Sequence, residues 1–179
     1  MDNKEAFEVF KGNYEKYQGQ YTTLMGMNRG YSREWFLDRI EAIRRILPEA
    51  SISTDIITGF CGETEEDFQE TLSLLDRVQY DNIYAFAYSP RPGTRASKMV
   101  DDVPNDVKNE RLNRLLQHQL KIAKNRYAER IGQEMEVLVE GMAKNQNMIK
   151  PDAQGVVTGR VWTGRTTCNR VVNFADTSN

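Results

Sequence analysis

Residues 53–64 read STDIITGFCGET, and this stretch decides the fold class of the chain. Its isoleucines and threonines favour a strand, expected over 52–60 and buried on both faces. Gly59 and Gly62 turn the chain so that backbone amides can approach a ligand closely. Thr64 then caps a helix expected over 65–78, with acidic residues in its first turn. This order of strand, glycine turn and capped helix is typical of ligand sites in α/β proteins.

The sequence on both sides of this stretch continues the alternation of helices and strands. Ser32 caps a helix expected over 33–47, and a second strand over 82–88 ends in the turn 89–94. Right-handed crossovers set such strands parallel, so both turns are expected at the carboxyl edge of one sheet, where ligands bind. A helix expected over 104–131 follows, with these apolar residues: Leu112, Leu115, Leu116, Ile122, Ala123 and Tyr127.

Beyond residue 131 the pattern changes to short strands, expected over 135–141, 155–162 and 169–174 and separated by polar, glycine-bearing links. This pattern is typical of a small antiparallel barrel. We therefore expect an α/β region over 27–130 and a small barrel over 131–179. Residues 1–26 carry aromatic residues at helical spacing and are expected to form a helix outside both regions.

The composition excludes several classes of protein. The chain has 179 residues, of which 39% are hydrophobic, and a formal net charge of −2. It contains no apolar run of bilayer length and no signal-peptide pattern, so a cytoplasmic chain with no membrane partner is expected. Its two cysteines, Cys61 and Cys168, lie far apart and predict neither a disulfide framework nor a metal motif. Positive charge gathers near the C-terminus, where 158–173 hold three arginines and no acidic residue.

Few single residues point to chemistry. Asp55 either accepts structural hydrogen bonds from neighbouring loops or lies at the rim of a ligand cavity. Arg91 and Arg95 flank a proline–glycine turn, where they either meet a phosphate or carboxylate or stay solvated. His118 has no second metal ligand near it in sequence, which favours a solvated or hydrogen-bonded histidine. No phosphate loop, Ser-His-Asp order or cysteine cluster is present.

Five motifs nevertheless occur in an order that resembles one family. They are MNRGY at 27–31, TDIITGFCGET at 54–64, YSPRPGT at 88–94, DDVP at 101–104 and GRTTCNRVVNF at 164–174. The order is similar to that of radical S-adenosylmethionine methylthiotransferases, and most of all to the tRNA enzymes that methylthiolate isopentenyladenosine beside the anticodon. The resemblance runs from about Met27 to Asn179.

The resemblance implies a fold, cofactors and partners. Residues 27–130 would be the C-terminal portion of a partial (β/α) TIM-like radical SAM barrel, and 131–179 a truncated TRAM domain, a small OB-like barrel that binds RNA. The complete enzyme uses S-adenosylmethionine and two [4Fe-4S] clusters and acts on tRNA. Contacts with S-adenosylmethionine are expected from Asp55, Ile57, Gly59, Gly62, Glu63, Tyr88 and Ser89, and contacts with RNA from Arg91, Lys144, Arg160, Arg165, Asn169 and Arg170.

The cysteines depart from the family pattern. Such enzymes carry a Cys-x-x-x-Cys-x-x-Cys motif for the radical cluster and three further cysteines, in an N-terminal domain, for an auxiliary cluster. Cys61 and Cys168 can supply neither set, so no catalytic residue or metal ligand is assigned. We expect a fragment that is inactive alone, whose open strand edges are covered by residues 1–26, a partner chain or self-association. The alternatives are a non-catalytic RNA-binding module, a sister methylthiotransferase acting on another nucleoside or a ribosomal protein, and an unrelated small α/β enzyme.

Overall fold

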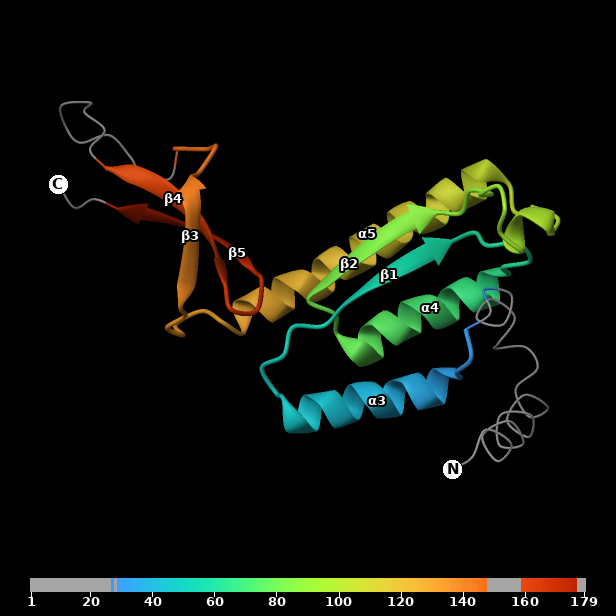
Figure 1. Cartoon of the computed structure of the whole chain (residues 1–179), viewed down its shortest axis with the longest axis horizontal. Helices are drawn as coiled ribbons and strands as arrows, with labels where there is room; N and C mark the ends of the chain where they lie inside the picture. The colour runs from blue at the N-terminus through green and yellow to red at the C-terminus, as the bar shows by residue number, and fades with distance from the viewer. Residues whose placement is uncertain (1–26, 28, 148–158, 177–179) are drawn as a thin grey trace. The chain divides into compact units, whose positions relative to one another are not determined.

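The computed structural model describes residues 27, 29–147 and 159–176. The chain divides into two compact units, unit 1 through Glu129 and unit 2 from Arg130 (Figure 1). The predictions for residues 1–26, and for the beginning of the strand over 155–162, lie outside the described residues. No helix in the described part of the chain is long and apolar enough to cross a membrane.

Unit 1 alternates helices with two parallel strands, as the sequence predicts. Strand β1 pairs with β2 in parallel, with Asp55 opposite Tyr84 and Ile57 opposite Phe86. The elements of this unit are α3 (Arg33–Ile46), β1 (Ser53–Thr58), α4 (Glu65–Val78), β2 (Asn82–Ala87), the short 3-10 helix η1 (Ala96–Lys98) and α5 (Asn105–Ala128).

The predicted helix caps are confirmed. The Ser32 side chain accepts a hydrogen bond from the amide of Trp35 at 3.2 Å, which begins α3. Thr64 and Asp67 form a reciprocal capping box at the start of α4, in which each side chain bonds the other residue's amide. These bonds satisfy amides that lack a partner inside the helix, and so they fix where each helix begins.

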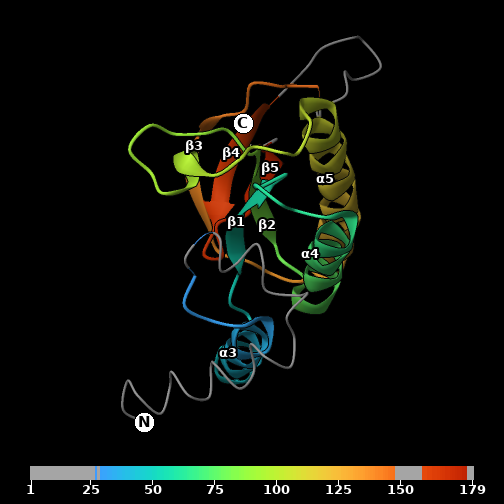
Figure 2. The ribbon, with the colours of Figure 1, turned by 90° about the vertical axis from the view of Figure 1, so that its right-hand side faces the viewer.

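One face of the β1–β2 pair is covered and the other is open. Figure 2 shows α4 and α5 on the same side of the two strands. The core on that side contains Ile40, Phe68, Leu75, Val78, Tyr80, Ile83, Leu115 and Ile122. On the other face Ile57, Tyr84 and Phe86 are 39%, 53% and 57% exposed. The expectation that the first strand is buried on both faces is therefore wrong for this chain, because helices cover one face of the pair.

Helix α5 buries some of its apolar residues and some of its polar ones. Leu116 and Tyr127 are exposed. Lys108, Arg111 and Gln119 are buried instead, alongside Leu115 and Ile122. Buried charges are tolerated when they are paired, and the partners of Lys108 and Arg111 lie on loops at the carboxyl edge of the sheet. Gln119 instead donates to the carbonyl of Tyr80, just before β2.

Unit 2 contains a small antiparallel sheet in the order β3-β4-β5, built from β3 (Val137–Met142), β4 (Arg160–Thr166) and β5 (Val171–Asp176). Trp162 pairs with Phe174, and the register of β3 against β4 shifts between Val139 and Gly141. The turn between β4 and β5 places Asn169 in a left-handed conformation with φ 62°, which asparagine tolerates well. The prediction of short antiparallel strands after the long helix is confirmed for the described residues.

Candidate functional site

The two predicted turns meet where β1 and β2 end. The amide of Tyr88, just after β2, donates to the carbonyl of Thr58 at the end of β1 over 2.8 Å. The rings of Phe60 and Tyr88 then pack edge to face, with centroids 5.0 Å apart. Tyr88 is buried, and its hydroxyl donates to the carbonyl of Ala96 at 3.2 Å. Burial is the main reason that the pKa of Tyr88 rises to about 12.

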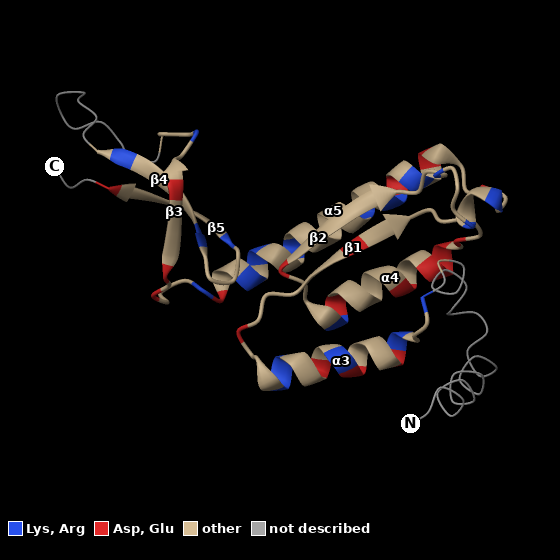
Figure 3. Cartoon of the chain, in the orientation of Figure 1, with Lys and Arg blue, Asp and Glu red and all other residues tan. Residues whose placement is uncertain are grey.

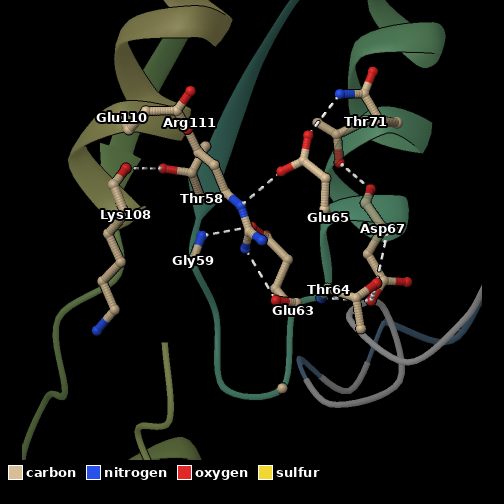
Figure 4. Close-up of polar contacts among 12 residues, drawn as sticks. Thr58, Gly59, Glu63, Thr64, Glu65, Asp67, Thr71, Lys108, Glu110 and Arg111 are labelled. Carbon is tan, nitrogen blue, oxygen red and sulfur yellow. Dashed lines mark hydrogen bonds and ion pairs between the residues drawn. The ribbon is translucent and has the colours of Figure 1, made fainter. Parts of the chain in front are cut away.

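The carboxylate of Glu63 lies under the first turn. Figure 4 shows it between the amide of Gly59 and the guanidinium of Arg111. Its Oε1 accepts hydrogen bonds from both groups at 2.9 Å, and Arg111 also donates to the backbone carbonyl of Glu63. The side chains of the two charged residues are only 3% and 7% exposed. Burial raises the pKa of Glu63, while the Gly59 amide and the charge of Arg111 oppose that shift.

A second carboxylate bonds the other end of the same turn. The amide of Gly62 donates to Oδ1 of Asp102 at 2.7 Å. Gly59 and Gly62 both have positive φ, 69° and 78°, so the turn uses the conformational freedom of glycine at both positions. Both glycine amides are therefore engaged by carboxylates of the chain itself. A ligand can bond these amides only by replacing Glu63 or Asp102.

Lys108, in the first turn of α5, lies against the Gly59–Gly62 turn and against the segment that follows β2. Its side chain is 3% exposed, and its ammonium donates to the two oxygens of Asp101 at 2.6 and 2.7 Å. The ammonium also lies 5.3 Å from the centre of the Tyr88 ring, within the range of a cation–π contact. A Cβ added to Gly59 would overlap Cγ of this lysine and lie 3.3 Å from its Cα.

Further charged pairs link α4 and α5 beside Glu63 and Arg111. Figure 3 shows basic and acidic residues along both helices. Arg114 donates to Glu65 at 2.8 Å, and that hydrogen bond is the first cause of a lowered pKa for Glu65. His118 contacts Asp76 at 2.6 Å, so it is a hydrogen-bonded histidine, as interpreted from the sequence. Within the described ranges no group of three or more histidine, cysteine or acidic residues is placed to hold a metal ion.

The other predicted cofactor residues of unit 1 lie away from the buried residues Glu63, Lys108 and Arg111. Asp55 and Ile57 are exposed on the open face of β1, and Ser89 is exposed after β2. A cavity of about 460 Å³ runs along β1, and both Asp55 and Ile57 line it together with Arg29 and Tyr80. Asp55 thus lines a cavity, and its contact with a cofactor stays a prediction.

The predicted RNA residues separate into accessible and buried positions. Nε of Arg165 lies 2.9 Å from Oε1 of Glu140, and its NH1 donates to Oδ1 of Asn169 at 3.3 Å. Arg170 is 6% exposed, and its guanidinium donates to Sγ of Cys168 at 2.9 Å. Arg170 is therefore a much less accessible RNA candidate than Arg165. The remaining candidates, Arg91 in unit 1 and Lys144 and Arg160 in unit 2, are exposed.

The sequence analysis did not predict the role of two residues at the carboxyl edge of β1 and β2. Lys108 and Arg111 hold the turn and the following loop, but they had no part in the predicted site. A pattern was available, because basic residues recur at 108, 111 and 114 on one helical face while acidic residues crowd 63–67. Basic residues on the buried face of a helix need acidic partners, and this run supplies them for Arg111 and Arg114, while Asp101 pairs with Lys108.

Comparison with known proteins identifies relatives of the chain. No model of a protein family matches it. It is 51% identical over 137 residues to the tRNA-2-methylthio-N(6)-dimethylallyladenosine synthase of Thermus thermophilus, a match that covers 76% of this chain and 30% of that protein. Proteins of the same name from Acetivibrio thermocellus and Bdellovibrio bacteriovorus are each 44% identical, over 161 and 160 residues. These matches cover 89% of this chain and 31% and 32% of the two relatives.

The chain thus spans about a third of the length of the curated relatives it matches. Identities of 44–51% over such lengths show common descent. The chain is therefore homologous to a part of the tRNA-2-methylthio-N(6)-dimethylallyladenosine synthases.

Proposed function

We propose that this chain supplies part of an enzyme that adds a methylthio group to isopentenyladenosine in tRNA. The observation that carries the proposal is the 51% identity over 137 residues to a synthase of that name. In this proposal residues 27–130 are the C-terminal portion of a radical SAM barrel, and residues 131–179 are a TRAM domain. The parallel strands with helices on one face support the first assignment, and the antiparallel three-stranded sheet supports the second.

The carboxyl edge of β1 and β2 is the proposed wall for S-adenosylmethionine. The open face supplies the chemistry that such a ligand needs, since it combines the Asp55 carboxylate with the apolar surface of Ile57 and Phe86. A carboxylate can accept hydrogen bonds from ribose hydroxyls, and apolar side chains can cover the adenine ring. Tyr88 and the glycine turn act here by shaping the wall, because their polar groups are already bonded within the chain.

The residues of this chain do not fit an iron–sulfur cluster. Each cluster needs at least three thiolates from one neighbourhood, whereas Cys61 is buried in unit 1 and Cys168 belongs to unit 2. S-adenosylmethionine supplies radical chemistry only beside such a cluster, so no chemical step is assigned to this chain alone. We expect that reconstitution with iron and sulfide gives no stoichiometric cluster. A cluster lost in Cys61→Ala or Cys168→Ala would overturn this assignment.

A second candidate function, a module that binds RNA without catalysis, is favoured by the paired Arg165 and Asn169 in unit 2. Arginine is well suited to phosphate, and an amide side chain can accept and donate hydrogen bonds. We expect tRNA affinity to fall with salt and to fall further in Arg165→Ala, with the salt slope reduced by about 1. The matched control is Arg77→Ala, since Arg77 is an exposed arginine of unit 1 whose partner is also a glutamate.

Filter binding of labelled tRNA at several salt concentrations makes this measurement. Loss of affinity in the unit 2 variant but not in the control supports RNA binding by unit 2. Equal affinity in all three proteins, or binding independent of salt, removes the basis of the RNA assignment.

The open face of β1 and β2 is proposed to be covered by another segment of a longer protein or by a partner chain. Ile57, Tyr84 and Phe86 form adjacent apolar positions that a stable protein normally buries. When the chain is alone, we expect this face to drive self-association. Sedimentation velocity should show a mass that increases with concentration, and Phe86→Ser should reduce the increase. A monomer at all concentrations would contradict this expectation.

A further inference from the structure

We propose that Lys108 is a positioning residue that couples the Gly59–Gly62 turn to the loop after β2, so that the two sides of the carboxyl edge keep one arrangement. The importance of this coupling for cofactor binding rests on the proposed function, since both segments contain residues assigned to S-adenosylmethionine. The coupling itself rests on contacts of described residues alone.

The first link is a steric contact at Gly59. The stem of Lys108 fills the space that a side chain at position 59 would need, because an added Cβ would overlap Cγ of the lysine. The lysine backbone lies close as well, with its Cα 3.3 Å from that point. Lys108 can therefore keep this position only while residue 59 is a glycine, and the turn and the first turn of α5 pack directly against each other there.

The second link runs through the charged end of the same side chain. The ammonium binds both oxygens of Asp101, and the next residue, Asp102, accepts the hydrogen bond of the Gly62 amide at 2.7 Å. One buried lysine thus reaches the first glycine of the turn through its stem and the second glycine through two consecutive aspartates. The ammonium of Lys108 also contacts the ring of Tyr88, so the same side chain contacts the residue that follows β2.

Because its charge is buried, Lys108 fixes the position of the loop that contains Asp101. An ammonium on a side chain that is 3% exposed must keep an acidic partner, because an unpaired buried charge is costly. Asp101 has a side chain that is 31% exposed and belongs to a loop without regular structure between η1 and α5. The helix residue is therefore the fixed member of the pair, and the loop is held by it. Arg111 supports the same turn from beneath through Glu63.

Lys108→Met tests the coupling, since methionine retains most of the apolar stem and removes the ammonium. Arg114→Met is the matched control, because Arg114 lies on the same helix and has acidic partners, but its side chain is 37% exposed. Two quantities are measured in the full chain. One is the hydrogen-exchange rate of the Gly62 amide relative to that of Phe86, whose amide faces β1 in the parallel register, followed by NMR. The other is the affinity for S-adenosylmethionine by titration calorimetry.

We expect Lys108→Met to accelerate exchange at Gly62 by about tenfold relative to Phe86, the effect of losing one hydrogen bond to a charged group. A purely structural role would accelerate both amides together. We also expect the affinity for S-adenosylmethionine to fall about tenfold if Asp102 and the turn move apart. Arg114→Met should change neither quantity. Asp101→Asn, which keeps the lysine and weakens the same bond, should reproduce the selective effect at Gly62 if Lys108→Met does not fold.

Each outcome decides one part of the proposal. Unchanged relative exchange at Gly62 in both variants would overturn the coupling. Selective exchange at Gly62 with unchanged affinity for S-adenosylmethionine would keep the coupling but refute its role in the cofactor site. Absence of binding by the unmodified chain would refute the proposed cofactor wall in this chain, while the exchange measurement would still decide the coupling.

Discussion

Replacement of Gly59 by alanine tests the packing of the carboxyl edge more sharply than any other single substitution. Gly59 has a φ of 69°, and a left-handed residue with a side chain costs about 1–2 kcal/mol. The added Cβ would also overlap Lys108, and overpacking of this kind costs about 1–3 kcal/mol. We therefore expect Gly59→Ala to lower the free energy of unfolding of unit 1 by about 2–5 kcal/mol.

Gly62→Ala separates the two contributions. Gly62 has a similar φ of 78°, but no atom lies within 4 Å of an added Cβ. This variant should therefore lose only the backbone contribution, about 1–2 kcal/mol. The difference between the two variants measures the contact between Gly59 and the stem of Lys108.

Urea unfolding followed by tryptophan fluorescence is a suitable assay. Trp35 lies in α3 of unit 1, and Trp162 lies in β4 of unit 2, so a Trp162→Phe background reports on unit 1. Equal losses of stability in Gly59→Ala and Gly62→Ala would refute the proposed steric contact. A larger loss in Gly62→Ala would refute it more strongly.

Three further outcomes follow from the charged groups. Arg111→Met leaves the carboxylate of Glu63 buried without its cation, so it should destabilise unit 1 by about 3–5 kcal/mol in the same urea assay. Arg114→Met, which breaks an exposed pair, should cost less than about 1 kcal/mol, and equal losses would contradict the burial of the first pair. Burial raises the pKa of the Cys168 thiol, but the hydrogen bond with Thr166 and the charge and hydrogen bonds of Arg170 outweigh it and bring the pKa below its usual value. Because the thiolate forms at lower pH, Cys168 should react with iodoacetamide near neutral pH faster than buried Cys61, and mass spectrometry of the alkylated peptides would show equal rates if this is wrong.

Local features of unit 1 could be predicted from the sequence because neighbouring residues determine them. The caps at Ser32 and Thr64 are examples, since each bonds amides within three residues of itself. The parallel pairing of β1 with β2 was also predictable, because an intervening helix leaves little alternative. These features can be predicted without knowing how the rest of the chain packs.

The buried faces could not be predicted in the same way. Whether Ile57 is covered depends on what lies beside the sheet, and the alternation of residues along β1 does not contain that information. The burial of Arg111 likewise depends on Glu63, which is 48 residues away in sequence. The carboxylates that occupy the glycine amides are a third example, because the turn sequence shows available donors but not their acceptors.

A chimera can show whether this chain has the residues of a working segment of a tRNA methylthiotransferase. The 137 matched residues would replace their counterparts, 30% of the Thermus thermophilus synthase, which supplies the remainder of its own length. The nucleosides of tRNA from a strain that lacks the enzyme and carries the chimera are then analysed by mass spectrometry. We expect the methylthiolated form of isopentenyladenosine. A folded chimera that yields only the unmodified nucleoside, or that modifies a different one, would contradict it.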